Sequence, residues 1–418
     1  MDIQKLLQPD LQHYILRHEA VDEKSLLLKN KTTSGVSTSL IADQISGRRK
    51  ARIKLPSWYK TKNIIYPPSI NLEQCSSETT AHYKTEITQR FFSEYHAVNS
   101  SNRAVDLTGG FGVDSFFLSS VFSNVDYTEP DENLFEIVKH NHSILQESGI
   151  QNPESRIRHY NTTAEKFLAS TKDKFDLIYI DPSRRLKGNQ KIVRLANCAP
   201  DIIELLDIIF DKTEILLLKA SPMLDLQQGI KELRNVTRVF VLAVDNECKE
   251  VLFLCRKGYT SEPVIEAVDL RSSLHKSAFP FFEFQASEEK SSVAEFSSPL
   301  HYLYEPHAAI LKAGAFKLIA QRFAVKKLQL HTHLYTSENL VQHFPGKIFE
   351  IEAMIKPNPK VVKHYFPEAK ANVVSRNYPL SPEQLKKKTG LKDGGQKFLI
   401  GFSGVKEKFV AVCNKVLL

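Results

Sequence analysis

Apolar and polar residues follow two different rhythms along the chain. Up to about residue 95, apolar and aromatic residues recur at helical spacing, most clearly over 78–98, after a break at 67–71 that contains two prolines. From Arg103 onward, short β-rich runs alternate with longer amphipathic stretches. The pattern predicts a helical region over residues 1–95 and then an α/β domain over residues 96–260.

The β-rich runs of the α/β domain are spaced for a parallel sheet. They lie at 104–107, 124–128, 156–160, 175–180 and 214–219. Helical stretches between them predict a sheet covered by helices on both faces. Two further runs, 236–244 and 250–255, are joined by a polar segment so short that the two strands must be antiparallel. The sequence therefore predicts seven strands, with one reversed strand near the end of the sheet.

The regular alternation stops after Gly258. A stretch rich in Ser and Glu at 285–299 is the best candidate for a linker, and short strands and helices follow it. We expect a linker and a small domain over 261–340 and a second small α+β domain over 341–418.

The charge of the chain changes the picture of its C-terminal part. The chain has 56 Lys and Arg against 48 Asp and Glu. Residues 341–418 hold 14 of these basic and six of these acidic residues, and the run at 47–62 has seven basic residues and no acid. Aromatic residues are interspersed: Trp58, Tyr59, Tyr365, Phe366 and Tyr378. Such runs suit a phosphate backbone with unstacked bases, although each alone is also typical of a solvated surface.

Other residue types exclude several classes of protein. The five cysteines are scattered without C-x-x-C spacing, which indicates reduced thiols and no zinc site. His331 and His333, with His343 nearby, are better interpreted as surface histidines than as metal ligands. Neither an apolar run of about 20 residues nor a signal-peptide pattern is present, so we expect no membrane partner. The scattered, reduced cysteines predict a cytoplasmic protein, and neither they nor the histidines predict a bound metal.

A glycine-rich turn follows the first predicted strand, in AVDLTGGFGVDS (104–115). Asp106 ends the strand, and Gly109, Gly110 and Gly112 allow a bound cofactor to approach the backbone closely. The turn lacks the lysine of a P-loop and the third glycine of a dinucleotide fingerprint. It fits better the pattern acid-x-G-x-G-x-G, with Thr108 in place of the first glycine. The alternative is a turn that serves only the chain's topology.

Two further segments after predicted strands complete a candidate cofactor site. Glu129 directly follows the second strand, where a carboxylate can hold two ribose hydroxyls. Alternatively, Glu129 and Asp131 are only acids in the first turn of a helix. After the third strand, Thr163 or Glu165 would have to accept a hydrogen bond from an adenine amino group.

The fourth parallel strand ends in an unusual polar sequence, IDPSRR (180–185). Asp181 and the carbonyl of Pro182 can accept hydrogen bonds from an exocyclic amine and orient its lone pair toward an electrophilic methyl group. Ser183, Arg184 and Arg185 would shape the acceptor side. The alternative is a turn with exposed arginines.

These motifs together resemble those of a known family. AVDLTGGFG, YTEPD, IYIDPSRR and LLLKASPMLD are similar to class I S-adenosylmethionine (AdoMet)-dependent methyltransferases. LEQCSSETTAHYK and SRNYPLSPEQLKKKTGL resemble a Bacteroidetes family of these enzymes with C-terminal ferredoxin-like and THUMP-like domains. The resemblance implies a Rossmann-like seven-stranded core, AdoMet as cofactor, and an RNA target such as tRNA or rRNA.

Departures from the usual motifs leave the substrate open. Methyltransferases that act on amines usually have an aromatic residue where Ser183 and Arg184 stand; an arginine could stack on a base or hold a phosphate. The stretch Lys219-Ala220-Ser221-Pro222, directly after the next strand, contains no cysteine, which disfavours covalent C5 methylation. Lys219 itself is interpreted as a solvated lysine at a strand end; the alternative is a contact with substrate phosphate. We expect methylation of a base nitrogen in RNA. The alternatives are an RNA-binding protein with a vestigial core and a methyltransferase of another substrate.

Overall fold

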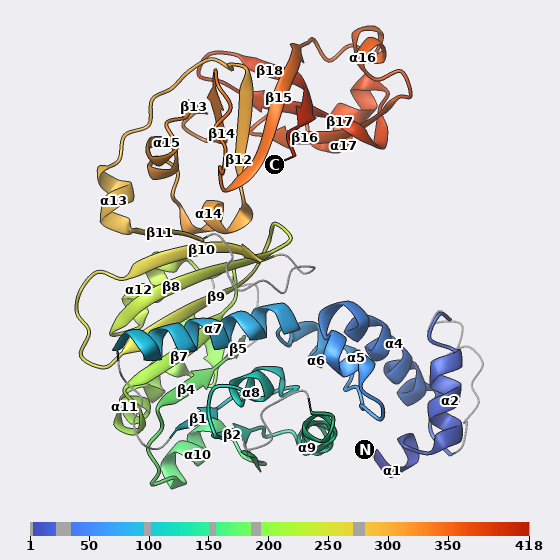
Figure 1. Ribbon diagram of the computed structural model, residues 1–418, viewed down its shortest axis with the longest axis vertical. Coiled ribbons are helices and arrows are strands. Elements are labelled where there is room, and N and C mark those ends of the chain that lie inside the picture. Colours follow the sequence, from blue (N-terminus) through green and yellow to red (C-terminus); the bar gives the residue numbers. More distant parts are fainter. Residues whose placement is uncertain are drawn as a thin grey trace. The chain divides into compact units, whose positions relative to one another are not determined.

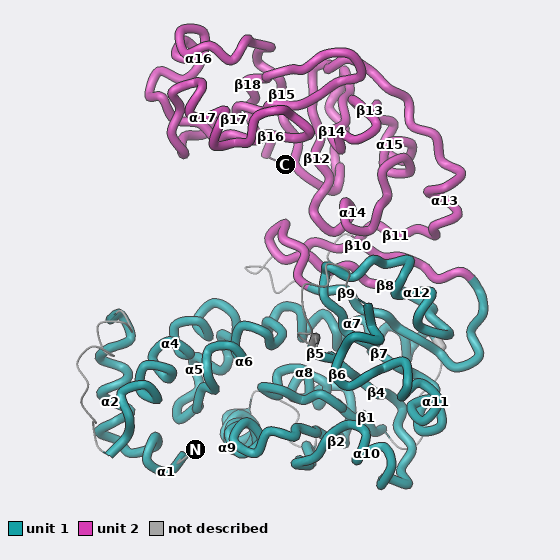
Figure 2. Tube along the Cα trace, turned by 180° about the vertical axis from the view of Figure 1, so that it is seen from behind, with its two compact units in different colours: residues 1–238, 250–261, 271–275 teal, residues 239–249, 262–270, 276–418 magenta. Residues whose placement is uncertain are grey.

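The computed structural model describes residues 3–21, 35–95, 102–149, 156–184, 194–270 and 281–417. The chain divides into two compact units (Figure 2). Among the described residues, the first unit comprises those up to 238 and those at 250–261. The second comprises 239–249, 262–270 and the residues from 281 onward.

The N-terminal region is helical, as its apolar spacing predicted. Its helices are α1 (Ile3–Leu6), α2 (Pro9–Arg17), α4 (Thr38–Lys54), α5 (Pro56–Lys60), α6 (Ser69–Gln74) and α7 (Glu78–Tyr95). The region shares a hydrophobic core with the first helices of the α/β domain (Figure 1). Trp58 of α5 is fully buried and meets the ring of Phe116 edge-on at 4.9 Å.

Two of the aromatic residues proposed to stack on bases are instead part of the core. Trp58 has no exposed surface and Phe366 is 3% exposed, so neither ring is available to a base. Tyr59 lies under the guanidinium group of Arg48, 4.4 Å from ring centroid to Cζ. The basic run at 47–62 therefore offers charges without the predicted indole platform.

The main sheet confirms the predicted α/β class. Its strands begin with β1 (Arg103–Asp106), β2 (Asn124–Thr128), β3 (Arg156–Tyr160), β4 (Leu177–Ile180), β7 (Ile215–Ala220), β8 (Val236–Val244) and β9 (Glu247–Arg256). β1 to β4 and β7 are parallel, and β9 pairs antiparallel with β7. β4 and β7 are buried at every position, as their unbroken apolar runs require in a sheet covered on both faces.

Helices connect the parallel strands. They are α8 (Val113–Leu118), α9 (Glu132–Glu147), α10 (Ala164–Ser170), α11 (Ile202–Lys212) and α12 (Leu226–Glu232). Short polar side chains start most of them: Asp131, Thr163, Asp201 and Asp225 each accept a backbone N–H of the first turn.

Two strands beyond the seven predicted extend this sheet. β10 (Val264–Leu270) and β11 (Phe281–Gln285) give the order β11-β10-β8-β9-β7-β4-β1-β2-β3. β10 is almost entirely buried, and its pairing covers what would otherwise be the open edge of β8.

The C-terminal part forms a second sheet of seven strands. These are β12 (Tyr302–Pro306), β13 (Lys326–Gln329), β14 (Thr332–Ser337), β15 (Gly346–Met354), β16 (Lys370–Arg376), β17 (Lys392–Ser403) and β18 (Lys408–Lys415), in the order β13-β14-β12-β15-β18-β17-β16. Its helices are α13 (Ala286–Ser291), α14 (Ala308–Ala313), α15 (Leu318–Arg322), α16 (Pro359–Tyr365) and α17 (Pro382–Thr389). Leu399 and Ile400, neighbours on β17, enter two different hydrophobic clusters, because successive side chains point to opposite faces of a sheet.

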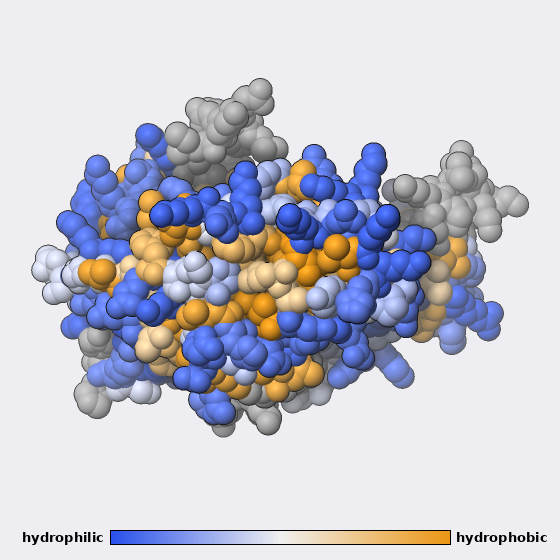
Figure 3. Space-filling model, turned by 90° about the horizontal axis from the view of Figure 1, so that it is seen from above, coloured by the Kyte–Doolittle hydropathy of each residue, from blue (hydrophilic) through white to orange (hydrophobic). Residues whose placement is uncertain are grey.

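The surface is mixed in character. Figure 3 shows one face on which apolar residues gather in an irregular band bordered by hydrophilic ones. Among the described residues, no helix has the length and apolar character needed to cross a membrane.

Candidate active site

The four sequence motifs meet at one edge of the main sheet. Asp106, the last residue of β1, lies opposite Tyr127 of β2 and Tyr179 of β4, and Thr128 lies opposite Tyr160 of β3. The loops that follow these four parallel strands therefore start at the same level. This carboxyl edge is where open α/β sheets bind ligands.

The side chain of Asp106 holds the glycine-rich turn in place by hydrogen bonds. Its side chain is 1% exposed and accepts hydrogen bonds from the Thr108 N–H (3.0 Å) and the Ser115 hydroxyl (2.6 Å). Burial raises the pKa of Asp106 to about 7, against the lowering effect of these two hydrogen bonds. Both carboxylate oxygens are thus used within the turn, which makes Asp106 a positioning residue.

Gly109, Gly110 and Gly112 differ in the space around them and in their backbone conformation. A Cβ at Gly109 would lie 2.0 Å from the ring of Tyr127, and one at Gly112 would lie 2.5 Å from both Val138 Cγ1 and His142 Nε2. Gly112 also has φ +73°. Gly110 has φ +53°, but a Cβ there would meet only the Thr108 carbonyl oxygen, at 3.8 Å. Gly110 is therefore the glycine whose surroundings leave room for a ligand.

A pair of neutral histidines supports the far end of the turn. His142 Nε2 lies 2.9 Å from the Gly112 carbonyl oxygen, and His142 Nδ1 lies 2.9 Å from His159 Nε2. The carbonyl can only accept, so His142 donates from Nε2 and accepts at Nδ1. Burial lowers the pKa of His142 to about 3 and that of His159 to about 4, which keeps this arrangement uncharged near neutral pH.

Glu129 bridges the glycine turn and the start of α9. Its Oε2 accepts from the Gly110 N–H at 3.1 Å and its Oε1 from the Asp131 N–H at 2.8 Å. Burial raises the pKa of Glu129. The Glu129 carbonyl accepts from Asn161 Nδ2 at 2.8 Å, which ties the loop after β3 to the same place. Thr163 stands in that loop, but its hydroxyl caps α10 by accepting from the Lys166 N–H at 3.4 Å.

Asp181 is joined to the glycine turn by a direct hydrogen bond. Its backbone N–H donates to the Thr108 hydroxyl at 2.6 Å. Its Oδ2 pairs with Lys219 Nζ at 2.5 Å, its Oδ1 has no partner among the described residues, and the side chain is 32% exposed. Thr108, which stands where the motif usually has its first glycine, thus holds the backbone of Asp181, the residue expected to orient the methyl acceptor.

The rest of the DPSR segment is described only in part. Pro182 is buried. Ser183 is exposed, and its hydroxyl donates to the Ala199 carbonyl at 3.3 Å. β5 (Ser183–Arg184) pairs antiparallel with β6 (Cys198–Ala199), which is preceded by a short 3₁₀ helix (Leu195–Asn197). The side chain of Arg184 and all of Arg185 lie outside the described residues.

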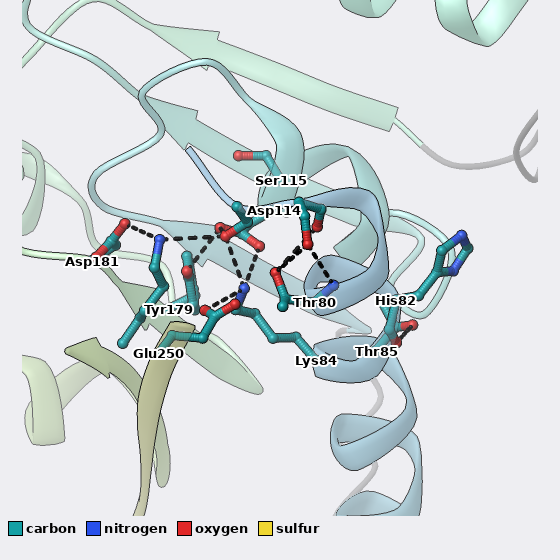
Figure 4. Close-up of polar contacts among 12 residues, drawn as sticks. Thr80, His82, Lys84, Thr85, Asp114, Ser115, Tyr179, Asp181 and Glu250 are labelled. Carbon is teal, nitrogen blue, oxygen red and sulfur yellow. Dashed lines mark hydrogen bonds and ion pairs between the residues drawn. The ribbon is translucent and has the colours of Figure 1, made fainter. Parts of the chain in front are cut away.

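A buried group of charged side chains lies behind Asp181, and the sequence did not reveal it (Figure 4). Lys84 Nζ contacts Ser76 Oγ (2.8 Å), Asp114 Oδ1 (3.0 Å) and Glu250 Oε2 (2.8 Å); the last contact is an ion pair without hydrogen-bond geometry. Tyr179 donates to Asp114 Oδ2 at 2.8 Å. We call Ser76, Lys84, Asp114, Tyr179, Lys219 and Glu250 the buried charge cluster.

Lys219 corrects one interpretation of the sequence. It was expected to be a solvated lysine at a strand end, yet it is 8% exposed and paired with Asp181. Burial lowers the pKa of Lys219, but the attraction of Asp181, Glu250 and Asp114 outweighs this and raises it above its ordinary value. Lys219 is therefore a charged partner of Asp181, the residue expected to orient the methyl acceptor.

Comparisons with known proteins agree with this architecture. Family models match a ferredoxin-like domain at residues 302–345 and a THUMP-like domain at residues 346–415. A solved structure of a presumed methyltransferase from Porphyromonas gingivalis W83 is 30% identical, with a TM-score of 0.82 over 100% of both chains.

The chain belongs to the class I AdoMet-dependent methyltransferase family with C-terminal ferredoxin-like and THUMP-like domains.

More distant structures resemble only part of this methyltransferase-family chain. An rRNA methylase from Streptococcus thermophilus is 16% identical over 41% of this chain and 94% of its own, with a TM-score of 0.29. An AdoMet-dependent methyltransferase from Agrobacterium tumefaciens is 15% identical over 43% of this chain and 62% of its own, with a TM-score of 0.31. A search of curated protein sequences finds no match.

The turn and strand ends of this family member fit AdoMet. Gly110 leaves space for a ligand beside the Glu129 carboxylate, and both stand at the carboxyl edge of the sheet. Within the described part of the chain, no group of three or more His, Cys, Asp or Glu side chains is placed to hold a metal ion.

We expect Thr108→Val to lower methyl transfer about tenfold or more, whereas Thr108→Ser keeps it. Valine retains the shape but leaves the Asp181 N–H without its acceptor, and an unsatisfied buried donor costs about 1–3 kcal/mol. The measurement is the initial rate of methyl transfer at saturating AdoMet. Equal rates for the valine and serine variants would show that the shape of Thr108 matters and its hydroxyl does not.

Proposed function

We propose that the protein is an AdoMet-dependent methyltransferase that methylates a base nitrogen of tRNA or rRNA. One observation carries the proposal: the Asp181 backbone is hydrogen-bonded to the glycine turn through Thr108, while its carboxylate stands at the open edge of the sheet. The residue that would hold the acceptor is thus fixed directly to the residues that would hold the cofactor.

The residues that would hold AdoMet come from three loops. The turn at Thr108, Gly109, Gly110 and Gly112 would allow close backbone approach. The Glu129 carboxylate, which already accepts from the Gly110 and Asp131 N–H groups, would use its remaining lone pairs to accept from the ribose hydroxyls. The Asn161 amide ties the loop 161–163 to the Glu129 carbonyl. Thr163 in this loop, or Glu165 just after it, would accept a hydrogen bond from the adenine amino group. When bound, AdoMet supplies an electrophilic methyl group on a sulfonium, so no nucleophilic side chain is required.

Asp181 and Pro182 orient the acceptor. The Oδ1 of Asp181, which has no partner among the residues that the structure describes, and the Pro182 carbonyl accept the two N–H groups of an exocyclic amine. This turns the nitrogen lone pair toward the cofactor turn. Lys219 holds Oδ2 in place, and its ammonium group lowers the pKa of the Asp181 carboxyl against the raising effect of burial. The proton released from the methylated nitrogen passes to Asp181, whose partly exposed side chain returns it to water.

The basic C-terminal domain supports RNA as the acceptor. Lys360 and Lys363 on α16 and Lys387 and Lys388 on α17 are exposed. α16 and α17 pack against each other within the region that matches the THUMP-like model. Exposed lysines on adjacent helices suit a phosphate backbone, and binding through them weakens as salt rises. A protein that methylates another substrate would show no affinity for bulk tRNA.

We expect Glu129→Gln to weaken AdoMet binding about 10- to 100-fold in a calorimetric titration. The substitution removes the charge from hydrogen bonds that are each worth about 1.5–3 kcal/mol. Glu132→Gln, at an exposed position in the first turn of α9, is the matched control and should bind AdoMet like the wild type. If wild-type protein shows no heat with millimolar AdoMet, the core is vestigial and the proposed function fails.

A further inference from the structure

Ser76 links Asp181, the residue proposed to orient the methyl acceptor, to the N-terminal region. Lys219 Nζ contacts both Asp181 Oδ2 and Ser76 Oγ, the latter at 3.3 Å. Ser76 Oγ also accepts from Lys84 Nζ at 2.8 Å and donates to Asp114 Oδ2 at 2.7 Å. One hydroxyl thus contacts two ammonium groups and one carboxylate. Ser76 and Lys219 thus connect Lys84 of α7 to Asp181.

The buried charge cluster and Asp181 do not balance in charge. Two ammonium groups, Lys84 and Lys219, face the three carboxylates of Asp114, Asp181 and Glu250. Lys84 is 2% and Glu250 3% exposed, so water screens their interactions little. Removing any one charge therefore changes the electrostatic potential at the others.

Each charged neighbour acts on the ionisation of Asp181 with a definite sign. Burial raises the pKa of Asp181, the Lys219 ammonium lowers it, and the negative charges of Asp114 and Glu250 raise it. Tyr179 contacts the group through Asp114 and is uncharged, because burial raises its pKa well above the ordinary value. Asp106 lies near enough for Asp181 to raise its pKa.

This arrangement gives the N-terminal region a part in the reaction. We propose that Ser76 and Lys84 of the N-terminal region, together with Glu250 of β9, are positioning residues that act through Lys219 on the orientation and ionisation of Asp181. The inference rests on the proposed function of Asp181 as the residue that orients the acceptor. It makes the segment before the glycine turn part of the methyl-transfer site.

The test is the pH profile of methyl transfer to RNA from a strain that lacks this gene. Glu250→Gln removes a negative charge, so the acid limb of the profile moves to lower pH. Lys84→Met removes a positive charge and moves the limb to higher pH. Lys84→Arg keeps the charge and leaves the limb near the wild-type position. Glu247→Gln, exposed on the same strand β9, is the matched control and leaves the limb unmoved.

A purely structural role predicts a different result. Variants that only loosen the fold lose activity at every pH without moving the limb, and unmoved limbs in both Glu250→Gln and Lys84→Met overturn the proposal. If Lys84→Met does not fold, the comparison of Glu250→Gln with Glu247→Gln decides alone.

A second readout separates this proposal from the proposed function. The Asp181 carboxyl carbon, assigned by its absence in Asp181→Asn, is titrated by ¹³C NMR in the full-length protein. The titration midpoint falls in Glu250→Gln if the cluster acts on Asp181 and stays at the wild-type value if it does not. This holds even if the protein transfers no methyl group, in which case only the proposed function fails.

Discussion

Asp181→Asn is expected to lower methyl transfer by about 10²- to 10⁴-fold, the usual range for the loss of a positioned acid–base group. The asparagine oxygen will turn to the Lys219 ammonium, which leaves the amide N–H₂ at the position of Oδ1. A donor then faces the donor groups of the acceptor amine. The measurement is the rate of tritiated methyl transfer to RNA.

The same variant should still bind AdoMet with nearly wild-type affinity, because the proposed cofactor contacts at Gly110 and Glu129 do not involve the Asp181 side chain. Asp207→Asn, an 87% exposed side chain on α11, is the control and should keep full activity. Wild-type turnover by Asp181→Asn would remove Asp181 from the acceptor site.

The largest effect on stability is expected for Lys84→Met. The substitution leaves Asp114 and Glu250 without their shared ammonium partner, and breaking a buried ion pair from one side costs about 3–5 kcal/mol. Urea unfolding of the full-length protein at pH 7 measures the loss. Lys387→Met, at an exposed position on α17, should change the free energy of unfolding by less than about 0.5 kcal/mol.

The loss in Lys84→Met should shrink at acidic pH. Burial raises the pKa of Asp114, but Lys84 and Lys219 together bring it below the ordinary value. A depressed carboxyl pKa contributes stability that is present above the unfolded pKa and is lost as the pH falls through the folded pKa. A stability difference between wild type and Lys84→Met that stays constant down to the acid transition would contradict the role of this ion pair.

Much of the fold could be predicted because its signals are local. The β-rich runs at 124–128, 156–160 and 236–244 coincide with β2, β3 and β8. The polar residues directly after such runs had to meet at one sheet edge once the strands were parallel. This explains why Asp106, Glu129 and Asp181 could be brought together from sequence alone.

The buried charge cluster could not be predicted because its members come from distant parts of the chain. Ser76, Lys84, Lys219 and Glu250 approach one another only when α7 packs on the sheet. One local signal was present: Lys84 follows Ala81 and precedes Ile87 at helical spacing, on the face of α7 that is buried. A lysine on such a face needs buried partners, although the spacing does not say which.

The extension of the main sheet also depends on long-range pairing. β10 and β11 come after the regular strand–helix alternation has stopped, and they pair antiparallel with each other. Trp58 and Phe366 were assigned to a surface because they stand among basic residues, yet both side chains are buried. Charged neighbours in sequence do not place an aromatic ring on the surface.

The most direct test of the account is methyl transfer from tritiated AdoMet to RNA of a strain that lacks this gene, followed by digestion to nucleosides. We expect label in one nucleoside whose methyl group is on a base nitrogen, and we expect the amount of label to fall as rising salt weakens RNA binding. Unlabelled RNA from a protein that binds AdoMet would contradict it.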